Sequence, residues 1–238
     1  MKFEICVHCF NYQRRLDWML SSIIQQEGSV PNIRVNISHI VDNGNPTTEN
    51  LITFFRDKGL DIISTVIDSD DSKNRSIARR QQLNDTDADW IIFADSDMVY
   101  SKLFFQELNN QVKTDQFKNE EKCIGADRIS LSIPFCIDFF NSDTTEYPMV
   151  IKNVEDRVKD WPVYRIGGKT IAAGYFQLAN VRLIRERHLE YPVKRYDGLR
   201  TYKADRAFRC VLGGRVGMDL PHQYHLNHSR ENVDGMQH

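Results

Sequence analysis

The sequence predicts an α/β fold in which a central, mostly parallel sheet is flanked by helices. Two observations carry this prediction. Over residues 1–100, apolar strand-like runs alternate with segments whose apolar residues recur at helical spacing. The run 90–94 is short, apolar and bulky, which is typical of a strand buried on both faces. Strands joined through helices form right-handed βαβ units, and such units place their strands parallel.

The first half of the chain is the regular half. We expect strands at 3–10, 35–41, 60–67 and 90–94, and helices at 14–26, 47–58 and 76–83. The first helix is indicated by apolar residues spaced three and four positions apart. Gly59 suits the C-terminal end of the second helix, because glycine readily adopts the left-handed conformation found there.

The pattern loosens after residue 100. We expect a helix at 102–112, a strand at 123–134, a loop with short elements at 141–165, a strand at 170–178, and helices at 181–187 and 201–212. No Pro/Gly/Ser-rich linker divides the chain. We therefore expect one domain over 1–238, with a regular half (1–100) and an irregular half (101–238).

Composition narrows the class of protein. The net charge of −2 at pH 7 does not favour nucleic acid as a partner. No apolar run reaches the roughly 18–20 residues that span a bilayer, although peripheral association with a membrane stays open. The N-terminus enters a strand-like run without a signal region, and the five cysteines do not form an even disulfide set. We expect a cytoplasmic protein, or a catalytic domain of a larger one.

The buried strand at 90–94 ends in two carboxylates, Asp95 and Asp97. Open α/β sheets bind their ligands at the carboxyl ends of the strands. Paired carboxylates there suit Mg²⁺ or Mn²⁺, which take oxygen ligands and often share them with substrate phosphates. The tripeptide Asp95-Ser96-Asp97 is also of a kind common in turns and helix caps, because an aspartate side chain accepts hydrogen bonds from backbone N–H groups.

Other polar residues follow the first strands and would meet the same sheet edge. An aromatic ring can stack on a base, a carboxylate can accept a ribose or base proton, and arginine can neutralise a diphosphate. The candidates after the first and second strands and just before or within the third helix are Phe10, Asn11, Tyr12, Arg14, Asp42, Arg75 and Arg79. Taken singly, each of these residues could instead line a cavity, form a turn or lie on the surface. The interpretation therefore depends on their expected placement together at one sheet edge.

This order of strands and polar residues resembles the nucleotide-diphospho-sugar glycosyltransferases of the GT-A fold, especially family 2. The resemblance implies that 1–100 binds the nucleotide and that 101–238 binds the acceptor. It implies nucleoside contacts for Phe10, Asn11 and Asp42, and donor contacts for Arg75 and Arg79. Asp95 and Asp97 would then flank a divalent metal, with Asp97 favoured as the direct ligand.

The resemblance extends into the second half. The segment around Gly174 and Tyr175 is similar to the floor of the donor and acceptor site, where glycine permits close approach of a sugar. The run 202–208 resembles the helix start that carries the catalytic base of inverting members, which implies that role for Asp205. Ala204 departs from the family pattern, and Asp205 could simply favour a helix N-terminus.

The histidine-rich tail is similar to the segment of β-1,4-galactosyltransferase-like enzymes whose histidine completes the metal site. The resemblance implies that His228 is that ligand, with His225 as the alternative. Imidazole suits Mn²⁺ better than Mg²⁺, which prefers oxygen. A polar tail with no metal is the competing interpretation.

The resemblance therefore implies a metal-dependent transferase that moves a sugar, with inversion, from a nucleotide-diphosphate donor (a UDP-sugar) to a saccharide hydroxyl. Two other classes stay open. The run from Asp95 to Val99 also fits the nucleophile motif of haloacid-dehalogenase-like phosphohydrolases, with Asp95 as nucleophile and Asp97 as general acid. A non-catalytic nucleotide-sugar-binding protein would also fit, with Ala204 marking a decayed site.

Overall fold

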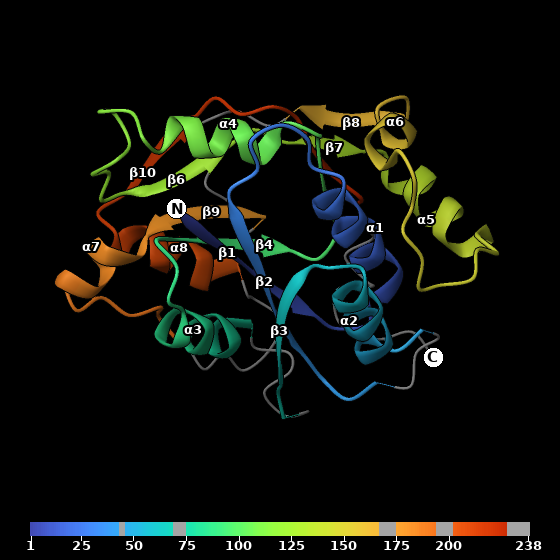
Figure 1. Cartoon of the computed structure of the whole chain (residues 1–238), viewed down its shortest axis with the longest axis horizontal. Coiled ribbons are helices and arrows are strands. Elements are labelled where there is room, and N and C mark those ends of the chain that lie inside the picture. Colours follow the sequence, from blue (N-terminus) through green and yellow to red (C-terminus); the bar gives the residue numbers. More distant parts are fainter. Residues whose placement is uncertain (43–45, 69–74, 167–174, 194–201, 228–238) are drawn as a thin grey trace.

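The structure is a computed structural model that describes residues 1–42, 46–68, 75–166, 175–193 and 202–227. Its centre is a seven-stranded sheet with the strand order β10-β6-β9-β4-β1-β2-β3 (Figure 1). The strands are β1 (Lys2–Cys9), β2 (Asn32–His39), β3 (Asp61–Val66), β4 (Trp90–Asp95), β6 (Cys123–Ala126), β9 (Phe176–Asn180) and β10 (Arg215–Met218). All of them run in one direction except β9, which is antiparallel to both neighbours, so the mostly parallel sheet is confirmed.

Helices cover both faces of this sheet. The core on one face includes residues of α1 (Gln13–Ile24), α2 (Thr48–Asp57) and α4 (Phe104–Gln111). The core on the other face includes residues of α3 (Arg75–Asp85), α7 (Val181–Glu186) and α8 (Tyr202–Val211). In Figure 1, α3, α7 and α8 are grouped together, on the other side of β1 and β4 from α1.

The alternating side chains of β4 explain why helices cover both faces of the sheet. Ile92 joins the core beneath α1 and α2, whereas Ile91 and Phe93 join the core beneath α3 and α8. Because successive strand residues point to opposite faces, a strand that is apolar at every position needs a helix layer on each side. The continuous apolar run in the sequence therefore fixes β4 in the middle of the molecule.

A second, four-stranded sheet has the order β5-β11-β7-β8. Its strands are β5 (Met98–Tyr100), β7 (Ile129–Leu131), β8 (Val163–Ile166) and β11 (Gln223–His225). Helices α5 (Ile133–Ser142) and α6 (Val154–Val158) lie near β7 and β8 at one end of the molecule (Figure 1). Val99 of β5 and Leu131 of β7 share a small apolar core with residues of both helices.

The prediction of one strand over 123–134 is wrong. This stretch is divided between β6 in the large sheet and β7 in the small one, and α5 begins at Ile133. Asp127 and Arg128 separate the two strands, and Pro134 occupies the first turn of α5, where a missing N–H is tolerated. The short elements expected at 141–165 are the end of α5, α6 and the start of β8.

The ten-residue helix α5 was not predicted, and the remaining differences are at element ends or among short strands. β9 begins at Phe176, and residues 170–174 of the expected strand lie outside the described residues. The sequence predicted neither β5, β10 nor β11, which have three or four residues each. Within the described residues, no helix is long and apolar enough to cross a membrane.

Candidate active site

The large sheet brings the predicted strand ends to one edge. β1 lies between β2 and β4, parallel to both, and its His8 is in register with Asp95. Phe10, Asn11 and Tyr12 follow β1, Asp42 follows β2, and Asp95 is the last residue of β4. This is the edge at which open α/β sheets bind ligands.

The small sheet adds a histidine to this edge. β5 starts directly after Asp97 and pairs antiparallel with β11, so that His225 faces Met98. The His225 Nε2 atom lies 3.2 Å from the Asp97 Oδ2 atom, and the Leu226 N–H donates to the Asp97 carbonyl oxygen at 2.8 Å. Ligand atoms of Asp95, Asp97 and His225 all lie within 4.8 Å of one another. This cluster has the residue types and spacing of a divalent-metal site.

Helix α3 places two arginines beside the same carboxylates. Arg75 donates through Nη1 to Asp95 Oδ1 at 2.8 Å and through Nη2 to Asp205 Oδ2. Arg79, one turn further on, donates to Asp205 Oδ1 and lies 3.6 Å from Asp95 Oδ1. Asp205 comes from α8, more than 100 residues away in sequence, so the fold joins two predicted groups into one charge network.

Asp205 has a third partner, Tyr191. The Tyr191 hydroxyl donates to Asp205 Oδ1 at 2.9 Å and accepts from Arg79 Nη1 at 3.2 Å. Its ring stacks on Phe208 with centroids 4.6 Å apart. Burial alone would raise the pKa of Asp205, but Arg75, Arg79 and the Tyr191 hydrogen bond hold it below the usual aspartate range. Asp205 is therefore a stable carboxylate in this arrangement.

The sequence interpretation did not single out Tyr191, because it lies outside the recognised motifs. For Arg15 it gave only a place among the arginines after the first strand. The Arg15 Nε atom donates to the Leu226 carbonyl oxygen at 3.2 Å, and its guanidinium lies over the Phe140 ring. Burial lowers the pKa of Arg15, and the nearby charge of Asp97 opposes that change. Arg15 thereby ties α1 to the backbone next to His225.

The residues proposed for the nucleoside lie at the correct edge, and their contact with a donor stays a prediction. Phe10 and Tyr12 are half-buried, and Asn11 is exposed with a left-handed backbone (φ 59°). The Asp42 carboxylate accepts the Thr48 N–H at the start of α2, so it already has a structural role. Arg14 also has structural partners, because it donates to the carbonyl oxygens of Phe140 (3.2 Å) and Asp143 (2.9 Å).

Two predicted site residues lie outside the described residues, Gly174 and His228. Tyr175 is described and buried, with its hydroxyl 3.4 Å from the Ala126 carbonyl oxygen and the Arg128 guanidinium over its ring. Contact of Tyr175 with a sugar therefore stays a prediction. The described candidate for the metal-binding histidine is His225.

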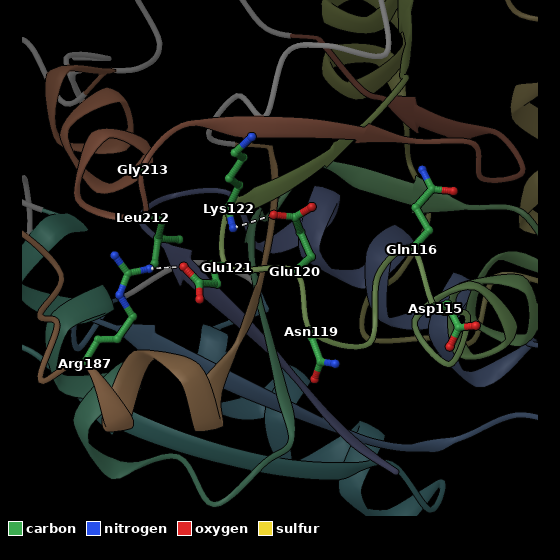
Figure 2. A pocket seen from close by; sticks show the side chains of 9 residues that line it. All are labelled: Asp115, Gln116, Asn119, Glu120, Glu121, Lys122, Arg187, Leu212 and Gly213. Atoms are coloured by element: carbon green, nitrogen blue, oxygen red, sulfur yellow. Dashed lines mark hydrogen bonds and ion pairs between the residues drawn. The ribbon is translucent and has the colours of Figure 1, made fainter.

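A surface pocket lies in a different part of the molecule from Asp95, Asp97 and Asp205 (Figure 2). It is lined by residues 115, 116, 119–122, 187, 212 and 213, which include the ion pair between Arg187 and Glu121. These residues precede β6 and β10 or follow α7, at the amino ends of strands parallel to β4. The pocket is therefore at the opposite sheet edge from Asp95.

The central sheet and its flanking helices match the GT-A fold. Residues 4–119 match the family described as glycosyl transferase family 2. Together with the shared fold, this match confirms the predicted resemblance to the family 2 glycosyltransferases of the GT-A fold. The phosphohydrolase interpretation is thereby set aside.

Solved structures with this fold have low sequence identity to the chain. TarS (residues 1–349) of S. aureus in complex with UDP-GlcNAc has a TM-score of 0.64 and 12% identity over 100% of this chain and 62% of that one. The mannosyltransferase PcManGT of Pyrobaculum calidifontis, in complex with GDP-Man and Mn²⁺, has a TM-score of 0.56 and 12% identity over 94% and 56%. The chain thus spans about three fifths of each of these two solved chains. None of the curated proteins matches the sequence.

Proposed function

We propose that the chain transfers a sugar from a nucleotide-diphosphate donor, a UDP-sugar, to a hydroxyl of a saccharide acceptor with inversion at the anomeric carbon. The observation that carries the proposal is the cluster of Asp95, Asp97 and His225 at the end of β4. Its position corresponds to the ligand-binding edge of the fold. TarS and PcManGT, which share that fold, were solved with UDP-GlcNAc and GDP-Man.

The donor set of this cluster fits a divalent cation. Two carboxylates and one imidazole suit Mn²⁺, whereas Mg²⁺ would rely on the carboxylates and on diphosphate oxygens. Asp97 is the better direct ligand, because it is only 2% exposed and faces His225, while Asp95 is bound by Arg75. When bound, the cation would supply Lewis-acid stabilisation of the departing diphosphate. Arg75 and Arg79 would add positive charge at the same place.

Asp205 is our candidate for the catalytic base. It would take the proton of the acceptor hydroxyl as that oxygen forms its bond to the anomeric carbon. The bond from the anomeric carbon to the donor diphosphate breaks at the same time, and the nucleotide leaves with the electron pair. Support comes from the position of Asp205 beside Arg75 and Arg79, which also contact Asp95. The proposed halves, 1–100 for the nucleotide and 101–238 for the acceptor, both contribute to this arrangement.

The setting we propose is cytoplasmic, with no nucleic-acid partner and with peripheral membrane contact left open. Cys6, Cys9, Cys123 and Cys136 are buried free thiols and Cys210 is an exposed one, which suits a reducing compartment.

Calorimetric titration of UDP and of GDP, each with and without Mn²⁺, tests the proposal. We expect one nucleotide to bind only with Mn²⁺ present, and Asp97→Ala to abolish that binding because it removes a buried ligand. A nucleotide affinity that changes neither with Mn²⁺ nor with the substitution would contradict the metal assignment. Absence of binding for both nucleotides would contradict the transferase proposal. Binding with no transfer or hydrolysis of the matching nucleotide sugars would instead favour a non-catalytic binding protein.

A further inference from the structure

Arg75 bridges two carboxylates that have different tasks in the proposed function. One terminal nitrogen of its guanidinium binds Asp95, in the metal cluster, and the other binds Asp205, the proposed base. The Nε atom of Arg75 has no hydrogen-bond partner among the described residues. One side chain therefore connects the donor side of the site to the acceptor side.

The two arginines on α3 differ in their freedom to move. The Arg79 side chain is 1% exposed, contacts Tyr191 and lies over the Phe93 ring at 5.4 Å. The Arg75 side chain is 21% exposed and belongs to the first residue of the helix. Arg79 is thus fixed by the core, whereas Arg75 can change partners with a change of rotamer.

Asp205 can act as a base only if one of these ion pairs opens. A carboxylate that accepts hydrogen bonds from two guanidinium groups and a phenol has its lone pairs engaged and binds protons weakly. A nucleotide diphosphate brings negative charge to the same edge, and guanidinium binds phosphate oxygens in a bidentate manner. A cation bound to Asp95 would at the same time repel the Arg75 guanidinium and weaken the Arg75–Asp95 ion pair.

We propose that Arg75 holds Asp205 until the donor binds, and that the donor diphosphate then draws Arg75 away and leaves Asp205 free to accept the acceptor proton. This inference rests on the proposed function and adds a trigger for its catalytic base. Only the donor-bound protein has a competent base, so an acceptor bound without the donor is not deprotonated.

Competition for Arg75 can be measured as coupling between two substitutions. Asp205→Asn removes the ion pair that the diphosphate must break. We therefore expect it to tighten UDP or GDP binding, in the presence of Mn²⁺, by about five- to tenfold. In an Arg75→Met background the same substitution should change the affinity by less than about twofold, because no pair is left to break. Uridine and guanosine lack phosphates. Each should therefore bind with the same affinity to the wild type, the two single variants and the double variant.

A matched control is Asp87→Asn, which neutralises an exposed carboxylate paired with Lys2 and Arg34. It should leave nucleotide affinity unchanged. An equal gain for Asp205→Asn in both backgrounds would show a general charge effect and overturn the inference. Weaker or unchanged binding of the nucleotide by the single variant Asp205→Asn would also overturn the inference. A wild-type protein that binds neither nucleotide would contradict the proposed function, and the inference with it.

A structure of the wild-type protein with Mn²⁺ and the bound nucleotide provides a second test that needs no substitution. We expect the Arg75 guanidinium on the diphosphate oxygens and Asp205 bound by Arg79 and Tyr191 alone. An Arg75–Asp205 ion pair that persists beside a bound diphosphate would overturn the inference, while leaving the proposed function intact.

Discussion

Tyr191 shows how a single hydroxyl supports a buried charge. The side chain is fully buried, and its hydroxyl lies between Arg79 and Asp205. Burial raises the pKa of Tyr191, so the group stays a neutral donor near neutral pH. A neutral donor can share the carboxylate with two arginines without adding charge to the cluster.

We expect Tyr191→Phe to lower the free energy of unfolding by about 1–3 kcal/mol, because two buried hydrogen bonds lose their shared partner. The ring should keep its packing on Phe208 and Phe93, so the change isolates the hydroxyl. Urea unfolding at pH 7 measures the effect. Tyr164→Phe is the control, because Tyr164 is 69% exposed and should change stability by less than about 0.5 kcal/mol. Equal losses in the two variants would contradict this account of Tyr191.

At the scale of elements, α1 holds the segment after α5 through a row of side chains four residues apart. Asp17 accepts the Met149 N–H at 3.0 Å, and the Ser21 hydroxyl accepts the Ile151 N–H at 2.9 Å. Residues four apart lie on one helix face, so one stripe of α1 satisfies several backbone groups of this irregular segment. The stripe contains a fully buried acid, Asp17.

This buried acid predicts a dependence of stability on pH. Burial raises the pKa of Asp17 to about 7 from an ordinary value of 3.8. Between those values the folded protein keeps a proton that the unfolded chain releases, so the free energy of unfolding falls as pH rises. We expect the loss between pH 4 and pH 8 to reach at most about 4 kcal/mol and to disappear in Asp17→Asn, which keeps the shape without the charge.

Urea unfolding of wild type and Asp17→Asn at several pH values measures that difference. Asp87→Asn serves again as the control, because Lys2 and Arg34 hold the pKa of Asp87 below its ordinary value. Its profile between pH 5 and pH 8 should run parallel to that of wild type. Parallel profiles for Asp17→Asn and wild type would show that Asp17 is ionised in the folded protein across this range.

Sequence patterns predicted the elements of the first half well, because each has a strong period of its own. β4 is continuous in its apolar residues, and α1 and α2 have apolar stripes. The split of 123–134 between two sheets was not predictable in this way, since a strand of three or four residues does not specify its partner strand. The approach of His225 to Asp97 depends on the pairing of β11 with β5, and neither strand has a clear period.

The charge network around Asp205 was predicted only in part. The motifs pointed separately to Arg75, Arg79 and Asp205, and the parallel sheet placed the strand ends together. That α8 packs against the same face as α3, and so brings Asp205 to both arginines, follows from tertiary packing of Phe208 and Leu83. Packing partners of this kind are not encoded in local periodicity.

At the scale of the molecule, the proposed metal site joins the two sheets. Asp95 ends a strand of the large sheet, whereas His225 belongs to the small one. A ligand that binds both should stabilise the folded protein as a whole, by RT ln(1 + [L]/Kd) when the unfolded chain does not bind. At a ligand concentration of a hundred times Kd this is about 2.7 kcal/mol, or about 5–11 °C in Tm for a chain of this size.

We therefore expect Mn²⁺ together with UDP or GDP to raise the Tm of the wild type by about that amount. His225→Ala should lose most of the rise, because it removes the contribution of the small sheet. The pocket in Figure 2 supplies the control: Glu121→Gln changes a carboxylate at the opposite sheet edge and should keep the full rise. Thermal unfolding of the three proteins, with and without ligands, measures the comparison. A rise lost in Glu121→Gln and kept in His225→Ala would place the cation in the pocket and remove it from the end of β4.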